Sequence, residues 1–269
     1  MNSNRKRVWI TGAGKGIGRA VAWEYATHGW DVAVSARTES DLDTLVREAQ
    51  AAGLKGRIVA LAADVTDQDA MKQTFKAAEH DLGPLDQVIL NAGTHIPNDA
   101  QTFSVAPYRT LMEINFMGVV NGLSAVVPAF IDRKRGAIGV VSSVAGFGGL
   151  PLASAYGASK AALINMCEAL RPELEMANVT LSVITPGFVR TPLTSKNTFA
   201  MPFRIEADEA ARHIYTGMES GRFEITFPWI FSTLLKILNK LPYGIYFAVT
   251  RRIISAKAAH RKATETTPP

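Results

Sequence analysis

The sequence has 269 residues, of which 47% are hydrophobic and one is a cysteine, and its net charge is +5. This apolar share excludes a disordered chain, and a single cysteine excludes an internal disulfide and a cysteine-rich zinc site. The length allows one large domain or two modest ones. The positive charge lies at the ends, because residues 5–7 carry +3 and the chain from Ile225 onward carries +6, which leaves −4 on residues 8–224.

Runs of β-branched residues recur along the chain with room for one helix between them, which is typical of a parallel sheet covered on both faces. The predicted strands are residues 7–11, 31–36, 56–62, 87–91, 137–142, 180–185 and 223–227. The predicted helices, several of them ended by glycine, are residues 18–28, 39–52, 67–81, 107–130 and 155–176. We therefore predict a doubly wound, Rossmann-like α/β domain over residues 1–228, with about seven parallel strands and helices on both faces.

Glycines fill the turn between the first predicted strand and helix, where Thr11 is followed by Gly12, Gly16, Ile17 and Gly18. Glycine lets the backbone approach a pyrophosphate closely, and the helix N-terminus offers unpaired N–H groups to it. The turn lacks the Gly-Lys-Ser/Thr ending of a P-loop nucleotidase. It therefore predicts a dinucleotide-binding site.

Two basic residues stand where the ribose of the dinucleotide would lie. Arg37 follows the second predicted strand, where an NAD-binding protein would carry an acidic residue, and Lys15 lies in the glycine turn. Both cations can pair with a 2′-phosphate, so we predict NADP(H) in preference to NAD(H). The alternative is that Arg37 is a solvated loop cation.

Four polar residues further along the chain are candidates for proton chemistry on a carbonyl. Tyr156 and Lys160 lie four residues apart on one helix face, where an ammonium lowers the pKa of a phenol and makes it a credible proton donor. Ser143 ends a strand at the carboxyl edge of the sheet and can bind the substrate oxygen. Asn115 lies inside a predicted helix, an unfavourable place without a polar task. Taken singly, each residue also has a structural interpretation. Tyr156 fits a half-buried aromatic, Ser143 a helix cap, and Asn115 a hydrogen-bonding residue of the core.

Together these residues resemble the short-chain dehydrogenase/reductase family, over about residues 7–191. The motifs that carry the resemblance are Thr-Gly-x-x-x-Gly-x-Gly at 11–18, Asp64-Val65, Asn91-Ala92-Gly93, Asn115, Ser143, Tyr156-x-x-x-Lys160, and Pro186-Gly187 with Thr191. One departure is Leu90, where many relatives have a second Asn.

The resemblance implies a role for each of these residues. Tyr156 would be the acid/base, Lys160 would lower its pKa and hold the nicotinamide ribose, and Ser143 would polarise the carbonyl. Asn115 would anchor a proton-relay water reaching Lys160, and Asp64 would contact the adenine. The expected cofactor-binding residues are Gly12, Lys15, Gly16, Ile17, Gly18, Arg37, Asp64, Val65, Asn91, Ala92, Gly93, Tyr156, Lys160, Pro186, Gly187, Val189 and Thr191. No metal site is expected, because the histidines show no ligand spacing.

The resulting hypothesis is an NADPH-dependent carbonyl reductase, or alcohol dehydrogenase in the reverse direction, that forms a homodimer or homotetramer. Residues 192–205 stand where this family carries its substrate lid, and their apolar content favours a hydrophobic 3-oxoacyl, steroid-like or aromatic ketone or secondary alcohol. Apolar lids also simply pack on the body. The alternative function is a non-catalytic NADP(H)-binding regulatory or scaffold protein on the same fold.

Residues 229–269 form a predicted C-terminal extension with an amphipathic helix over 230–241. Its predicted apolar face comprises Ile230, Phe231, Leu234, Leu235, Ile237, Leu238 and Leu241. Opposite lie the polar residues Ser232, Thr233, Lys236, Asn239 and Lys240. This helix is expected to cover the substrate pocket, to form a subunit interface, or to contact an anionic membrane peripherally through residues 229–262.

The same C-terminal segment bears on the cellular location of the protein and on nucleic acid as a partner. Its uncharged stretches, residues 225–235 and 241–250, are shorter than the roughly 20 residues that cross a bilayer, so we expect a cytoplasmic protein that is not integral to a membrane. Nucleic-acid binding is not expected, because the basic tail lacks interleaved aromatic residues. Residues 256–269 are predicted to be disordered.

Overall fold

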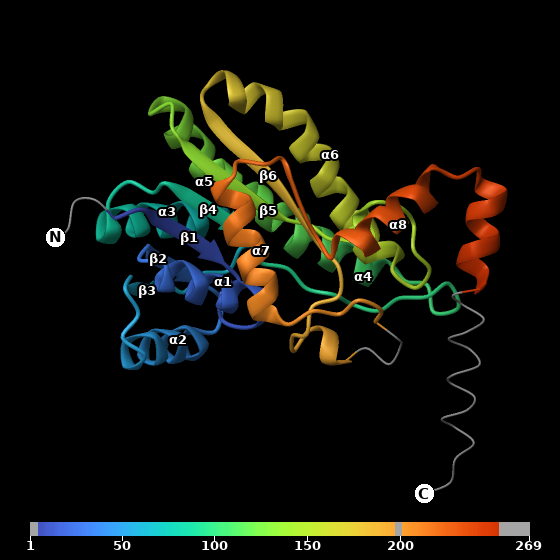
Figure 1. Ribbon diagram of the computed structural model, residues 1–269, viewed down its shortest axis with the longest axis horizontal. Helices are drawn as coiled ribbons and strands as arrows, with labels where there is room; N and C mark the ends of the chain where they lie inside the picture. The colour runs from blue at the N-terminus through green and yellow to red at the C-terminus, as the bar shows by residue number, and fades with distance from the viewer. Residues whose placement is uncertain (1–4, 197–200, 253–269) are drawn as a thin grey trace, which may run out of the picture.

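The computed structural model describes residues 5–196 and 201–252, and its centre is a seven-stranded parallel sheet in the order β3-β2-β1-β4-β5-β6-β7 (Figure 1). The strands are β1 (Arg7–Thr11), β2 (Asp31–Ser35), β3 (Ile58–Ala60), β4 (Gln87–Leu90), β5 (Gly136–Val141), β6 (Val179–Pro186) and β7 (Glu224–Phe227). The predicted doubly wound α/β fold with seven parallel strands is confirmed.

Helices cover both faces of this sheet. The helices are α1 (Gly16–Thr27), α2 (Glu39–Ala51), α3 (Gln68–Leu82), α4 (Val105–Leu111), α5 (Gly118–Asp132), α6 (Ser154–Met176), α7 (Ala207–Glu219) and α8 (Trp229–Lys240). One apolar core joins α1, α2 and α7 to the sheet, and a second joins α3, α5 and α6 to the opposite face. Side chains along β1 alternate between the two faces of the sheet, so Val8 and Ile10 lie in the first core and Trp9 lies in the second.

Two helical segments differ from the sequence-based expectation. The predicted helix 107–130 is divided into α4, a π-helix (Met112–Met117) and α5. Helix α7 has no counterpart among the predicted ranges, because its buried face consists largely of alanine and glycine. The whole segment Val105–Asp132 is 28 residues long and contains an 18-residue window with a mean hydropathy of 1.7, so by length and composition it is apolar enough to cross a membrane. It packs against α3 and α6 as part of the helical layer.

The C-terminal extension is helical, as predicted, over α8 and again over residues 243–252. The predicted apolar and polar faces of α8 do not coincide with the sides that the structure buries and exposes. Phe231 and Leu235 are partly buried beside Ser232, which is buried because its hydroxyl bonds Thr226 and a backbone carbonyl. Ile230, Leu234 and Ile237 are exposed. The predicted disordered tail, 256–269, lies outside the described residues.

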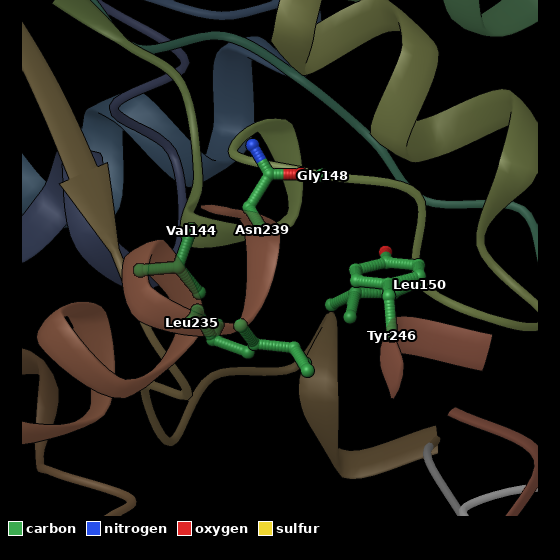
Figure 2. Close-up of a pocket in the computed structure, with 7 residues that line it drawn as sticks. Val144, Gly148, Leu150, Leu235, Asn239 and Tyr246 are labelled. Carbon is green, nitrogen blue, oxygen red and sulfur yellow. The ribbon is translucent and has the colours of Figure 1, made fainter. Parts of the chain in front are cut away.

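Helix α8 and the residues after it pack on the loop that follows β5 (Figure 2). The Tyr246 hydroxyl donates a hydrogen bond to the carbonyl of Gly149 at 2.6 Å. Lys236 lies over the ring of Phe147, 5.0 Å from its centre, and pairs with Glu224. The extension is thereby attached to the body at the carboxyl end of the sheet.

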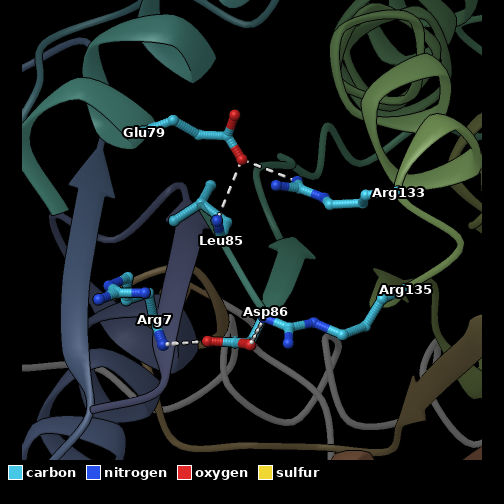
Figure 3. Close-up of polar contacts among 6 residues, drawn as sticks. All are labelled: Arg7, Glu79, Leu85, Asp86, Arg133 and Arg135. Atoms are coloured by element: carbon cyan, nitrogen blue, oxygen red, sulfur yellow. Dashed lines mark hydrogen bonds and ion pairs between the residues drawn. The ribbon is translucent and has the colours of Figure 1, made fainter. Parts of the chain in front are cut away.

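Ion pairs join the amino ends of the central strands, at the opposite edge of the sheet (Figure 3). Asp86 accepts a hydrogen bond from the backbone N–H of Arg7 at 2.9 Å and pairs with Arg135 at 2.8 Å. Glu79 pairs with Arg133 at 2.7 Å and caps the N–H just before Asp86. Both carboxylates therefore neutralise arginines at this edge.

Two of the three N-terminal cations form ion pairs within the fold. Lys6 pairs with Glu219 on α7 at 2.8 Å, and Arg5 pairs with Asp31 at the start of β2 at 3.3 Å. Two of the three N-terminal positive charges therefore have acidic partners in the body.

Candidate active site

A cleft of about 630 Å³ opens at the carboxyl ends of the strands. Its centre lies between β1 and β4, where the direction of strand order reverses and where ligands bind in this architecture. The predicted site residues that line it are Gly12, Lys15, Gly16, Ile17, Arg37, Asp64, Val65, Asn91, Ala92, Gly93, Ser143, Tyr156, Lys160, Pro186, Gly187, Val189 and Thr191. Gly18 and Asn115 are not among the residues that line the cleft.

The glycine turn leaves no room for side chains. Gly12 has φ +66°, and a Cβ at this position would lie 2.7 Å from the Cα of Ala92. Gly18 sits behind the turn, where a Cβ would lie 2.4 Å from the carbonyl oxygen of Gly12. Gly18 therefore lets α1 approach the turn and does not face the cleft.

Asn91 holds this turn to the neighbouring strand. Its side-chain amide donates to the carbonyl of Thr11 at 2.9 Å and to that of Gly12 at 3.2 Å. The hydroxyl of Thr11 in turn accepts the N–H groups of Asn91 and Ala92, at 3.0 and 3.1 Å. These bonds join the carboxyl ends of β1 and β4 into one rigid floor.

The N-terminus of α1 fits a phosphate group. Lys15 is the cap residue, and its side chain makes no hydrogen bond to the first helical N–H groups. By contrast, α3 is capped by the Asp67 carboxylate, which accepts from two backbone N–H groups at 2.9 Å each. The uncapped N–H groups and positive end of α1, beside glycines that admit no side chain, suit a pyrophosphate.

The ribose end of the cleft contains an acid that the sequence analysis did not foresee. Asp41, in the first turn of α2, lines the cleft and pairs with Lys15 at 3.1 Å. Arg37 is exposed and forms no ion pair within residues 5–196 and 201–252. The expectation of two cations without an acid is therefore corrected, and Arg37 stands as the cation without an acidic partner there.

The remaining predicted cofactor residues lie around the cleft, in loops that follow the carboxyl ends of strands. Asp64 accepts hydrogen bonds from the backbone and hydroxyl of Thr66, at 3.0 and 2.9 Å, which folds the loop after β3. Gly187 donates its N–H to the carbonyl of Phe227 at 2.7 Å. Thr191 exchanges backbone and hydroxyl hydrogen bonds with Thr194 at the start of the lid.

Tyr156, Ser143 and Lys160 meet in the middle of the cleft. The Ser143 side chain hydrogen-bonds Tyr156, and the Lys160 ammonium lies 5.9 Å from the centre of the tyrosine ring. Lys160 is buried, and its Nζ donates to the carbonyl of Val141 at 2.9 Å. Helix α6 and the end of β5 thus bring all three residues together, as the motif spacing predicts.

Burial is the main influence on the ionisation of this group. It raises the pKa of the Tyr156 phenol, and the hydrogen bond from Ser143 opposes that rise only in part. The lowering of this pKa by Lys160 and a bound cationic nicotinamide stays a prediction. Burial also lowers the pKa of Lys160 to about 8. At neutral pH the phenol is protonated and the amine is charged.

Asn115 is buried in the π-helix and does not line the cleft. Its side-chain oxygen accepts the N–H of Thr94 at 2.7 Å, and its amide donates to the Thr94 carbonyl at 3.0 Å and to Ser159 at 3.1 Å. π-Helical turns often occur at functional sites. Here the turn lets Asn115 fix the loop after β4 against α6.

The sequence model of the family described as short chain dehydrogenase matches residues 6–201. An uncharacterized oxidoreductase of Myxococcus xanthus is 38% identical over 91% of this chain and 96% of its own length. The 3-oxoacyl-[acyl-carrier-protein] reductase FabG of Thermotoga maritima is 35% identical over 70% of this chain and 75% of its own. This chain belongs to the short chain dehydrogenase family.

A solved structure gives the same result for the fold. A 3-oxoacyl-[acyl-carrier protein] reductase from Brucella melitensis with bound NAD is 28% identical, with a TM-score of 0.72 over 84% of this chain and 90% of that one. This member of the short chain dehydrogenase family is thus an oxidoreductase by relationship.

Some residues that line the cleft of this short chain dehydrogenase carry no motif. His95, which is not among the lining residues, packs edge-on against Tyr156, with the ring centres 5.0 Å apart. Pro192, Leu193 and Thr194 belong to the predicted lid, and the lining residues that sequence reasoning missed are Gly14, Ala36, Thr38, Asp41, Ala63, Thr94, Ile114, Val141 and Ser142. Most are neighbours of motif residues, and Asp41 alone had a signal of its own, as an acid in the first turn of the helix after Arg37.

Proposed function

We propose that this protein is an NADPH-dependent carbonyl reductase that also catalyses the reverse oxidation of the alcohol. The observation that carries the proposal is one cleft in which Tyr156, hydrogen-bonded to Ser143 and beside buried Lys160, faces the uncapped turn of α1. NADPH, when bound, supplies the hydride that reduces the carbonyl carbon. The turn at Gly12 and the N–H groups at the start of α1 would hold its pyrophosphate.

The protein's own groups then handle the proton. Ser143 donates a hydrogen bond to the substrate oxygen and holds it beside Tyr156, whose hydroxyl gives its proton to that oxygen. The raised pKa of Tyr156 keeps the phenol protonated at neutral pH, which favours reduction over oxidation. The charged Lys160 stabilises the phenolate left behind, and Asn115 holds the loop on the far side of Lys160.

Preference for NADPH is supported by Arg37. This side chain is exposed at the rim of the cleft, whereas Lys15 is paired with Asp41. A guanidinium binds a 2′-phosphate through charge-assisted hydrogen bonds. Binding of NAD by the Brucella relative makes NADH the competing cofactor.

The substrate that we propose is a hydrophobic ketone, with 3-oxoacyl compounds first among the candidates. Two relatives are named 3-oxoacyl reductases. Apolar Leu193, on the predicted lid, lines the cleft, and Val144 and Leu150, on the loop after β5 that we call the substrate loop, line a separate small pocket against α8. The complete catalytic set favours an enzyme over a non-catalytic scaffold on the same fold.

An oligomer in a reducing cytoplasm fits the rest of the molecule. Met117 and Ile131 are exposed on the long apolar segment Val105–Asp132, which suits contact with a second copy. The single cysteine, Cys167, is fully buried, and burial raises the pKa of its thiol to about 12.

The test is consumption of NADPH and of NADH by the purified protein with a panel of 3-oxoacyl thioesters, steroid-like ketones, aromatic ketones and aldehydes. We expect turnover of at least one hydrophobic ketone, with higher kcat/KM for NADPH. Binding of NADPH without turnover of any compound would favour the scaffold function instead.

A further inference from the structure

The outer face of the C-terminal extension carries an apolar surface, which we call the outer stripe. It comprises Trp229, Ile230, Leu234 and Ile237 on α8 together with Tyr243, Ile245, Phe247 and Val249 on the helical residues that follow. Leu234 and Ile237 are 53% and 54% exposed, and Trp229 and Tyr243 are 70% and 78% exposed. Apolar side chains of this size normally face a core.

The outer stripe is a fixed surface, because the opposite side of the extension is attached to the body. The Tyr246 hydroxyl holds the loop after β5, and the ring of Phe231 packs 5.6 Å from that of Phe188 and 6.0 Å from that of Phe203. In Figure 1 both helical pieces lie together at the end of the molecule away from β2 and β3. The stripe cannot turn inward without breaking these contacts.

Charge identifies the kind of partner. From Ile225 to Arg252 the chain contains four cations and no Asp or Glu; Lys236 pairs with Glu224, and Lys240 and Arg252 are exposed. A second copy docked face to face would bring these cations together without an acid from the same segment, which costs free energy. An anionic lipid surface would bury the apolar stripe and neutralise the cations at once. Exposed Trp and Tyr also favour the boundary between lipid and water.

We propose that the outer stripe docks on the surface of an anionic phospholipid membrane, with α8 lying in the interface and the cleft facing water. This goes beyond the proposed reductase function and does not depend on it. The surface would hold the substrate loop and lid close to lipid, where hydrophobic ketones accumulate.

The experiment is co-sedimentation of the full-length protein with vesicles of phosphatidylcholine alone and of phosphatidylcholine with phosphatidylglycerol. We expect binding to the anionic vesicles that weakens with salt. The affinity of the double variant Leu234→Ser/Ile237→Ser for these vesicles should be at least about tenfold lower, because each change removes apolar surface that the lipid would bury. Lys240→Gln/Arg252→Gln should also bind less. Vesicle binding needs no turnover, so its outcome is independent of the catalytic hypothesis.

Met176→Ser is the matched control, since Met176 is an apolar residue 90% exposed at the end of α6. It should bind vesicles as the wild type does. The proposal is overturned if the wild type remains in the supernatant, or if the double serine variant binds as strongly as the wild type. It is also overturned if the double variant lowers the oligomeric mass in light scattering while the wild type binds no vesicle, because the stripe is then a contact between copies.

Discussion

Replacing Arg37 by glutamine tests how the cleft distinguishes two cofactors. The change removes the cation at the rim that lacks an acidic partner within the described residues, and it keeps a polar side chain of similar length. NADPH and NADH differ only at the 2′-phosphate, so the effect should fall on NADPH alone.

The magnitude follows from the contacts that Arg37 can make. A hydrogen bond to a charged group contributes about 1.5–3 kcal/mol, and an exposed guanidinium belongs at the lower end of that range. With 1.4 kcal/mol for each factor of ten, kcat/KM for NADPH should fall about ten- to thirtyfold. Asp41→Asn should act in the opposite direction, because it releases Lys15 from a 3.1 Å ion pair at the same rim.

The assay is steady-state kinetics with both cofactors at saturating ketone. Arg47→Gln is the matched control, since Arg47 is an exposed arginine on α2, the helix that follows Arg37, and is not among the residues lining the cleft. We expect this variant to keep the wild-type ratio of kcat/KM values. Equal losses for NADPH and NADH in Arg37→Gln would refute the assignment of Arg37 to the 2′-phosphate.

Three further predictions concern the turn, the buried amine and the substrate loop. Gly12→Ala adds a clash with the backbone of Ala92, so it should abolish NADPH binding in calorimetry as well as destabilise the fold. Gly53→Ala is its control, because Gly53 has a similar φ of +63° with open space around it and should only lower the free energy of unfolding by about 1 kcal/mol. Because the pKa of Lys160 is about 8, ketone reduction should decline as pH rises through that value and the ammonium is lost; a profile flat across it would contradict the proposed role. Tyr246→Phe removes a 2.6 Å hydrogen bond to the substrate loop and should raise KM for the ketone about two- to tenfold, while Tyr243→Phe, at a 78% exposed residue, should change nothing measurable.

Local patterns along the chain predict most of this fold and much of the site. Strands buried on both faces read as continuous apolar runs, and glycines such as Gly12 are required where a Cβ would meet backbone. Motif residues that follow strands converge because the carboxyl ends of parallel strands share one edge of the sheet. The parallel sheet and the position of the cleft at its carboxyl edge therefore agree with the sequence analysis.

The features that escaped prediction depend on packing between distant segments. Asp41 reaches Lys15 only because α2 folds back over the glycine turn. The pKa of Tyr156 depends on its burial, which sequence spacing does not reveal. The rotation of α8 is set by contacts such as that of Ser232 with Thr226, so helical periodicity alone did not show which side of the helix faces the body.

The central claim is that Tyr156 supplies the proton in carbonyl reduction. The direct measurement is turnover of the best ketone by Tyr156→Phe at saturating NADPH, with Tyr215→Phe, in the aromatic cluster of Tyr25 and His28, as the control. Loss of a general acid should lower kcat about 10²- to 10⁴-fold in Tyr156→Phe while NADPH binding and the control stay at wild-type values. Full turnover by Tyr156→Phe would contradict the mechanism.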